Sequence, residues 1–187
     1  MVAMIVVLVV VLAVVWLFWG GRNKLVRLNV NVDEAQAQIS TQLQRRFDLI
    51  PNLVETVKGY AKHEQETFDK VTEARNAIGN ALKNSDPASV TEAEKQYQSA
   101  RLAINAVAEN YPDLKANQNF LALQEELTST ENKVAFARQA YNDSVRNLNI
   151  GIQVFPTSLI AGMFGFHKRE MFEVENVAAK EAPKVQF

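Results

Sequence analysis

The first 19 residues of the chain are all apolar, and this run constrains the fold more than any other feature. At 1.5 Å per residue, a helix of this length spans about 28 Å, which is close to the hydrocarbon thickness of a bilayer. A cleaved signal peptide would have a basic start and small residues at its end, whereas this run begins uncharged and ends in Trp16-Leu17-Phe18-Trp19. We therefore predict a permanent transmembrane anchor over residues 1–21, with residues 1–19 in contact with lipid.

The end of the apolar run has the composition of a membrane–water boundary. Trp16 and Trp19 would lie at the headgroups, and the next charged side chains are Arg22, Lys24 and Arg27. Because basic residues flank only this end, the positive-inside rule predicts a short N-terminus outside and the bulk of the chain in the cytoplasm.

The rest of the chain has the composition of a soluble domain. All 20 Lys+Arg and 21 Asp+Glu residues follow the apolar run, so roughly a quarter of the remainder is charged, an ordinary share for a folded domain. The net charge of −1 argues against nucleic acid as a partner, since phosphate binding needs a basic surface. Because the chain has no cysteine, it can form no disulfide, thiolate metal site or iron–sulfur cluster.

Beyond the anchor, apolar residues recur at steps of three and four, which is the period of a helix rather than of a strand. Helix ends are marked by Asn84-Ser85-Asp86-Pro87, by Tyr111-Pro112 and by Pro156. The sequence therefore predicts an all-α protein, with an N-terminal transmembrane helix followed by an antiparallel bundle of three to four long helices. We assign residues 22–32 to a juxtamembrane linker, residues 33–172 to the bundle and residues 173–187 to a flexible tail.

The number of helices depends on whether the first apolar stripe is continuous. If it is unbroken from residue 33 to residue 82, it forms a helix of about 75 Å in a staggered three-helix bundle. A break near residues 59–63 would give four helices of alternating direction, and the last helix would then return toward the membrane. The sequence does not choose between these alternatives.

An uncharged segment, residues 150–166, follows the last stripe and holds three glycines, three phenylalanines and a proline. It is too short and broken to span a bilayer, so it packs on the core, contacts another subunit or rests in the headgroup layer. The headgroup alternative gains weight only if the four-helix topology brings the segment back to the membrane. As a candidate assembly surface we name Leu159, Ile160, Met163, Phe164 and Phe166.

Four blocks of the sequence resemble the LemA family of bacterial membrane-anchored proteins. They are TQLQRRFDLIPNLVETVKGYAKHEQETFDKVTEARNAI at 41–78, YPDLKANQNFLALQEEL at 111–127, TENKVAFARQAYNDSVRNLN at 130–149 and FPTSLIAGMFGF at 155–166. The resemblance implies a single-pass protein of the bacterial inner membrane, with its helical bundle in the cytoplasm. It implies no established enzymatic activity; some relatives are linked to magnetosome membrane formation, and others neighbour membrane proteases.

The chain has no pattern typical of a cofactor, metal or catalytic site. A di-iron bundle needs Glu-x-x-His pairs, but the residues three positions before His63 and His167 are Tyr60 and Phe164. A zinc-protease helix would need a second histidine, and neither a phosphate-binding glycine loop nor a nucleophile motif occurs. We therefore expect no cofactor and no enzymatic activity.

Charged residues beside the apolar stripes are expected to fasten helices together. Arg46 and Asp48 belong to the first helix, and Arg138 and Asp143 belong to the last long one. We predict a structural network in which Arg46 and Asp48 reach Arg138 or Asp143, with partial burial strengthening the bonds. The alternative is a solvated set of charges that pair weakly with their neighbours.

Together these features favour a membrane-anchored, cytoplasm-facing helical scaffold that acts through protein–protein contacts and self-assembles as a homo-oligomer. Anchoring in a plane raises the effective concentration of subunits, so weak contacts suffice. Two alternatives stay open. One is a membrane-organising or membrane-remodelling protein whose C-terminal segment touches lipid, and the other is an adaptor for a membrane protease, which predicts a membrane-protein partner.

Overall fold

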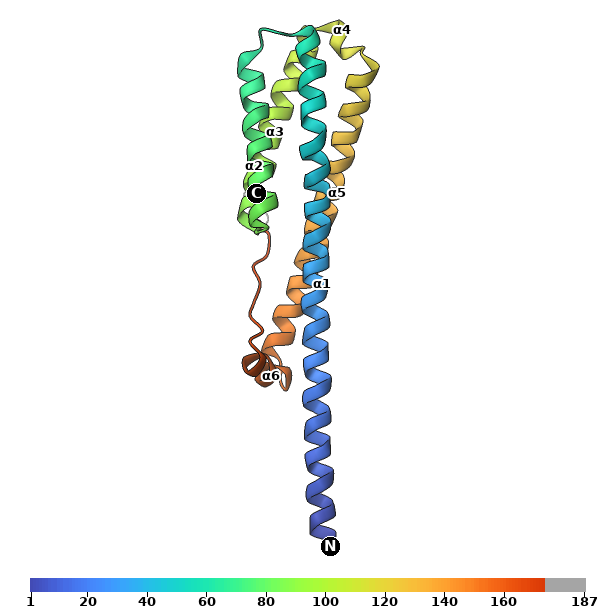
Figure 1. Cartoon of the computed structure of the whole chain (residues 1–187), viewed down its shortest axis with the longest axis vertical. Coiled ribbons are helices and arrows are strands. Elements are labelled where there is room, and N and C mark those ends of the chain that lie inside the picture. Colours follow the sequence, from blue (N-terminus) through green and yellow to red (C-terminus); the bar gives the residue numbers. More distant parts are fainter. Residues whose placement is uncertain (174–187) are drawn as a thin grey trace, which may run out of the picture.

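One helix runs from the N-terminus to the far end of the molecule (Figure 1). The computed structural model describes residues 1–173, and α1 occupies Val2–Tyr60, which at 59 residues is about 88 Å long. Residues 22–32, predicted as a linker, instead continue α1 without interruption. This stretch holds no glycine or proline, and its residues Leu25 and Val32 are fully buried, so packing favours the helix over a free linker.

The first apolar stripe breaks, and the four-helix alternative is confirmed. Residues 61–64 connect α1 to α2, which occupies Gln65–Asn84. The bundle continues with α3 (Pro87–Asn110), the short α4 (Pro112–Lys115) and α5 (Gln118–Gln153), and α6 (Thr157–Phe164) follows. Residues 1–173 contain no strand, which confirms the predicted all-α class.

Local sequence accounts for the helix ends. Ser85 closes α2 in the left-handed conformation, with φ of 53°. Asp86 then caps α3, because its Oδ1 accepts from the Ser89 amide at 2.8 Å, and Pro87 fits the first turn, where no amide proton is needed. Asn117 caps α5 by accepting from the Phe120 amide at 3.0 Å.

The four long helices form two antiparallel pairs of unequal length. α5 packs along α1, and α3 packs along α2. Figure 1 shows the α2–α3 hairpin beside only the half of the α1–α5 pair that is distant from the N-terminus. The distal section therefore has four helices and the proximal section has two. One continuous core joins the sections, and its members include Val32, Leu43, Ile78, Val90, Leu114 and Leu148.

Residues 165–173, here called the strap, run from α6 back toward the α2–α3 hairpin (Figure 1). Asn142 of α5 donates through Nδ2 to the Phe172 carbonyl oxygen at 3.1 Å and accepts through Oδ1 from the Phe172 amide at 2.8 Å. Asn149, two turns further along α5, binds both backbone groups of Arg169 in the same way. The Phe172 ring is buried and meets the Tyr141 ring edge-on, with centroids 5.1 Å apart. The strap is thus part of the fold.

The predicted flexible tail, residues 173–187, lies outside the described residues except for its first member.

Candidate functional site

The apolar end of α1 projects beyond the rest of the molecule (Figure 1). It is long and apolar enough to cross a membrane, and none of its most apolar window is buried within the fold. The predicted membrane-interface residues Trp16, Trp19, Arg22, Lys24 and Arg27 are all exposed on α1. This exposure suits side chains that meet lipid or headgroups instead of a protein core.

The short helix α6 docks on α1 just past the apolar run. Ile160 and Ala161 are each 1% exposed and share a small apolar cluster with Leu25. A Cβ atom on Gly21 would overlap the end of the Ile160 side chain, so the glycine permits the close approach of the two helices. Thr157 Oγ1 donates to the Gly151 carbonyl oxygen at 2.6 Å and fixes the turn between α5 and α6.

The opposite face of α6 is apolar and exposed. Leu159 and Met163 of the predicted assembly surface lie on this face and are 57% and 69% exposed. Phe164 is 50% exposed but lies on the side of α1, with its ring centroid 5.3 Å from the Arg22 guanidinium carbon. Ile160 does not belong to that surface, because it faces α1 and is buried, and Phe166 is half-buried in the same cluster. The predicted surface therefore divides into an exposed part and a part that holds α6 on α1.

A second notable cluster surrounds Arg46, which is fully buried where α1, α3 and α5 meet. Its Nη1 donates to both carboxylate oxygens of Glu94, at 3.1 and 3.2 Å, and its Nε donates to Thr130 Oγ1 at 3.4 Å. The guanidinium carbon lies 3.9 Å from the Tyr97 ring centroid. Burial raises the pKa of Tyr97, so this hydroxyl stays neutral beside the ion pair. Arg46 thus links three helices.

The predicted network is wrong in its partners. Asp48 is exposed and accepts from a glutamine one turn earlier on α1, while Asp143 is exposed and pairs with an arginine of its own helix. The Arg138 guanidinium lies 4.9 Å from the Phe172 ring centroid, so it packs on the strap instead of reaching α1. Of the four residues, only Arg46 bonds to other helices, and its partners there are Glu94 and Thr130 instead of Arg138 or Asp143.

Glu94, the charged partner of Arg46, was not predicted from the sequence. Glu94 sits one position past Ala93 and three before Tyr97, both of them buried, so it lies at the edge of the buried face of α3. Arg101 is seven residues further along α3, on the same face, and it pairs with Glu131 of α5. The seven-residue spacing indicates that Glu94 and Arg101 share one face of α3. Their partners on α1 and α5 could be named only once the helix arrangement was known.

The distal section contains a small cavity of about 20 Å³, lined mainly by apolar side chains that include Ile50, Ile104 and Leu127. A cavity of this size holds about one water molecule. Within residues 1–173, the structure groups no three His, Cys, Asp or Glu side chains in an arrangement that could hold a metal ion.

Helix α1 belongs both to the bundle and to the exposed apolar run, and α6 docks on it beside that run. This arrangement defines a membrane-associated helical protein. The chain belongs to the LemA family, whose profile matches residues 35–187. It is 26% identical over 162 residues to protein LemA of Metamycoplasma hominis, covering 87% of this chain and 73% of the relative.

Magnetosome proteins are also among the relatives. The chain is 25% identical over 174 residues to magnetosome protein MamQ 2 of Paramagnetospirillum magneticum, and 24% identical over 173 residues to MamQ of Magnetospirillum gryphiswaldense. The matches cover 81% and 80% of this chain, and each spans 64% of the relative's length. The resemblance carried by the four sequence blocks is therefore confirmed as family membership.

Proposed function

We propose that this protein is a non-catalytic scaffold of the bacterial inner membrane, with its bundle in the cytoplasm, and that it self-assembles in the membrane plane. The single observation that carries the proposal is an exposed aromatic side chain on the flank of the proximal section. Phe136 of α5 is 73% exposed, although it lies on a helix whose other face packs against the core. The magnetosome proteins among the relatives further support a role at a membrane.

The surroundings of Phe136 suit a contact between copies. A shallow groove between α1 and α5 is lined by Phe136 together with Gln38, Gln42, Ala137 and Ala140. Small alanine side chains leave room for a ring from a second copy, and the glutamine amides can donate and accept hydrogen bonds across the contact. The groove lies about 28 Å above the end of the apolar run, at the rise of a helix.

Membrane anchoring makes a small contact sufficient. Subunits that share a plane and an orientation meet at a high effective concentration, so each contact needs little affinity of its own. The continuous α1 helix also holds the groove of every copy at the same height above the membrane, which aligns the grooves for side-by-side contact.

The experiment is the mass of the full-length protein in mild detergent, compared between the parent, Phe136→Asp and Leu102→Asp. Leu102 is the matched control, because it is 70% exposed on α3, away from the groove. We expect one large species for the parent and the control, and a smaller species for Phe136→Asp with unchanged helicity.

A parent protein that is a lone monomer would overturn self-assembly, and an unchanged mass for Phe136→Asp would overturn the assigned groove. A monomer that co-purifies with another membrane protein would replace the scaffold with the adaptor alternative.

A further inference from the structure

Helix α6 is apolar on both of its faces, which is unusual for a short helix on the outside of a bundle. One face is accounted for, since Ile160 and Ala161 pack against α1. The other face exposes Leu159 and Met163, and the preceding turn exposes 80% of Phe155. Exposed apolar side chains gathered in this way mark an interaction surface.

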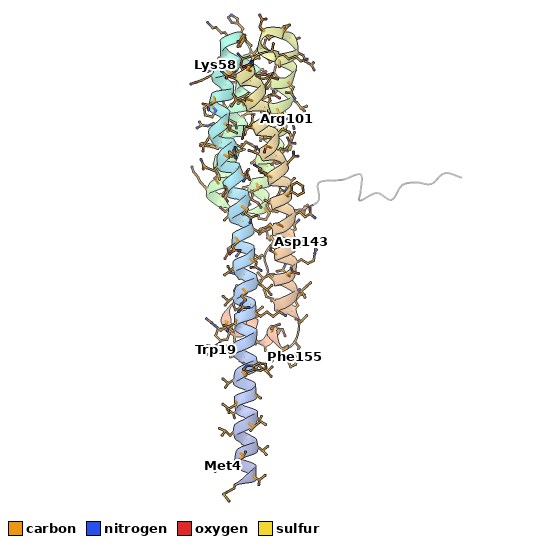
Figure 2. All side chains as sticks on the ribbon, turned by 90° about the vertical axis from the view of Figure 1, so that its right-hand side faces the viewer. Met4, Trp19, Lys58, Arg101, Asp143 and Phe155 are labelled. Carbon is orange, nitrogen blue, oxygen red and sulfur yellow. The ribbon has the colours of Figure 1, made fainter. Side chains whose placement is uncertain are left out.

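The position of α6 along α1 indicates the partner. Phe164 lines a groove with residues of the apolar run, among them Val14, Phe18 and Trp19. Figure 2 shows Phe155 level with Trp19 along the long axis of the molecule. About 20 helical residues cross the hydrocarbon core, so the turns of α1 beside α6 lie within about 10 Å of the headgroup boundary. Helices that lie in the membrane interface are buried to a similar depth, about 5–10 Å.

The charge pattern matches the same boundary. Residues 150–166 carry no charge, and the basic Lys168 and Arg169 follow after His167. On α1, the exposed Arg22 begins the basic flank of the apolar run, and its guanidinium carbon lies 5.3 Å from the Phe164 ring centroid. The uncharged α6 thus lies beside the turn of α1 at which the apolar run gives way to basic residues, as expected where acyl chains give way to anionic headgroups. Arg169 lies further from the apolar run, because its Nη2 donates to Asp33 Oδ1 at 3.0 Å.

We propose that the outer face of α6 inserts into the headgroup layer of the bilayer, so that the partner of this surface is lipid. The protein then meets the membrane at two points, the transmembrane part of α1 and the flat face of α6. Two attachments restrict the tilt and rotation of the bundle, which a single helix cannot do. The lipid contact also covers the apolar face that the fold itself leaves open.

Depth-resolved spin labelling of the full-length protein tests this assignment. The chain has no native cysteine, so single cysteines can be introduced at chosen positions and labelled. The test positions are Met163→Cys and Leu159→Cys, which are exposed on the outer face of α6. The references are Leu8→Cys within the apolar run and Leu102→Cys on α3, both exposed within the isolated chain. Each variant is reconstituted in vesicles of phosphatidylcholine and phosphatidylglycerol.

The measurement compares collisions of the label with oxygen, which concentrates in lipid, and with a water-soluble nickel complex. We expect the ratio at both α6 positions to shift from the Leu102 value toward the Leu8 value. A ratio equal to the Leu102 value would place α6 in water and overturn the proposal. Spectral broadening that disappears on dilution with unlabelled protein, without the oxygen shift, would overturn it in favour of a contact between copies.

Discussion

Replacing Arg46 with alanine should destabilise the bundle more than any change to its other charged residues. The guanidinium is fully buried, and its ion pair with Glu94 bridges α1 and α3 at 3.1 Å. Glu94 is only 12% exposed, so the substitution leaves a nearly buried carboxylate without its partner. Breaking a buried pair in this way costs about 3–5 kcal/mol. Thr130 is less affected, because its hydroxyl also donates to the Leu127 carbonyl oxygen at 2.7 Å.

The assay is thermal unfolding of the full-length protein in detergent, followed by circular dichroism. For a domain of this size, each kcal/mol lowers Tm by about 2–4 °C, so Arg46→Ala should lower it by about 6–20 °C. The neighbouring Arg45 provides the control: its pair with Glu126 is 49% and 45% exposed, and pairs of this kind contribute at most about 1 kcal/mol. Arg45→Ala should therefore lower Tm by only about 4 °C or less.

A double variant separates the lost charge pairing from the lost packing. Arg46→Met combined with Glu94→Leu removes both charges and keeps most of the buried volume, so it should recover most of the stability that Arg46→Ala loses. If the double variant is as unstable as Arg46→Ala, the unpaired carboxylate is not the cause. If Arg46→Ala and Arg45→Ala have the same Tm, the buried cluster contributes little to stability, and the predicted cost of unpairing Glu94 is refuted.

Two smaller predictions concern the α3 cap and the strap. Hydrogen bonds from the Ser89 amide and hydroxyl lower the pKa of Asp86 below its ordinary 3.8, so the cap stabilises the fold above that pH and loses this contribution in stronger acid. Asp86→Ala should lower the free energy of unfolding by about 1 kcal/mol at pH 7. Denaturant titrations of parent and variant should show this difference shrinking below pH ~4. A difference that stays constant with pH would refute the role of the carboxylate. Asn142→Ala removes two backbone hydrogen bonds of the strap, so hydrogen exchange of the Phe172 amide should accelerate, whereas the exposed control Asn147→Ala should leave it unchanged. Equal exchange in both variants would mean that the asparagine does not hold the strap.

Part of the site was predictable because its signals are local. The apolar run, the basic flank at Arg22 and the uncharged segment at residues 150–166 are each readable without any partner. Tyr141 follows the three- and four-residue apolar spacing of α5, and it is 3% exposed in the core. By contrast, the polar residue beside it, Asn142, gave no sign that it binds the strap backbone, because an asparagine on a helix has the same sequence pattern whether it meets water or another segment.

The sequence by itself determined that the chain is helical, where an apolar helix could cross a membrane, and where α2 and α3 end. These features depend on side chains within a few residues of one another, through periodicity, capping and apolar length. The tertiary structure alone decided that Arg46 meets Glu94, that Gly21 receives Ile160, and that α6 returns to the level of the anchor. Such contacts join segments distant in the sequence, and they depend on the break after α1, which sets the direction of every later helix.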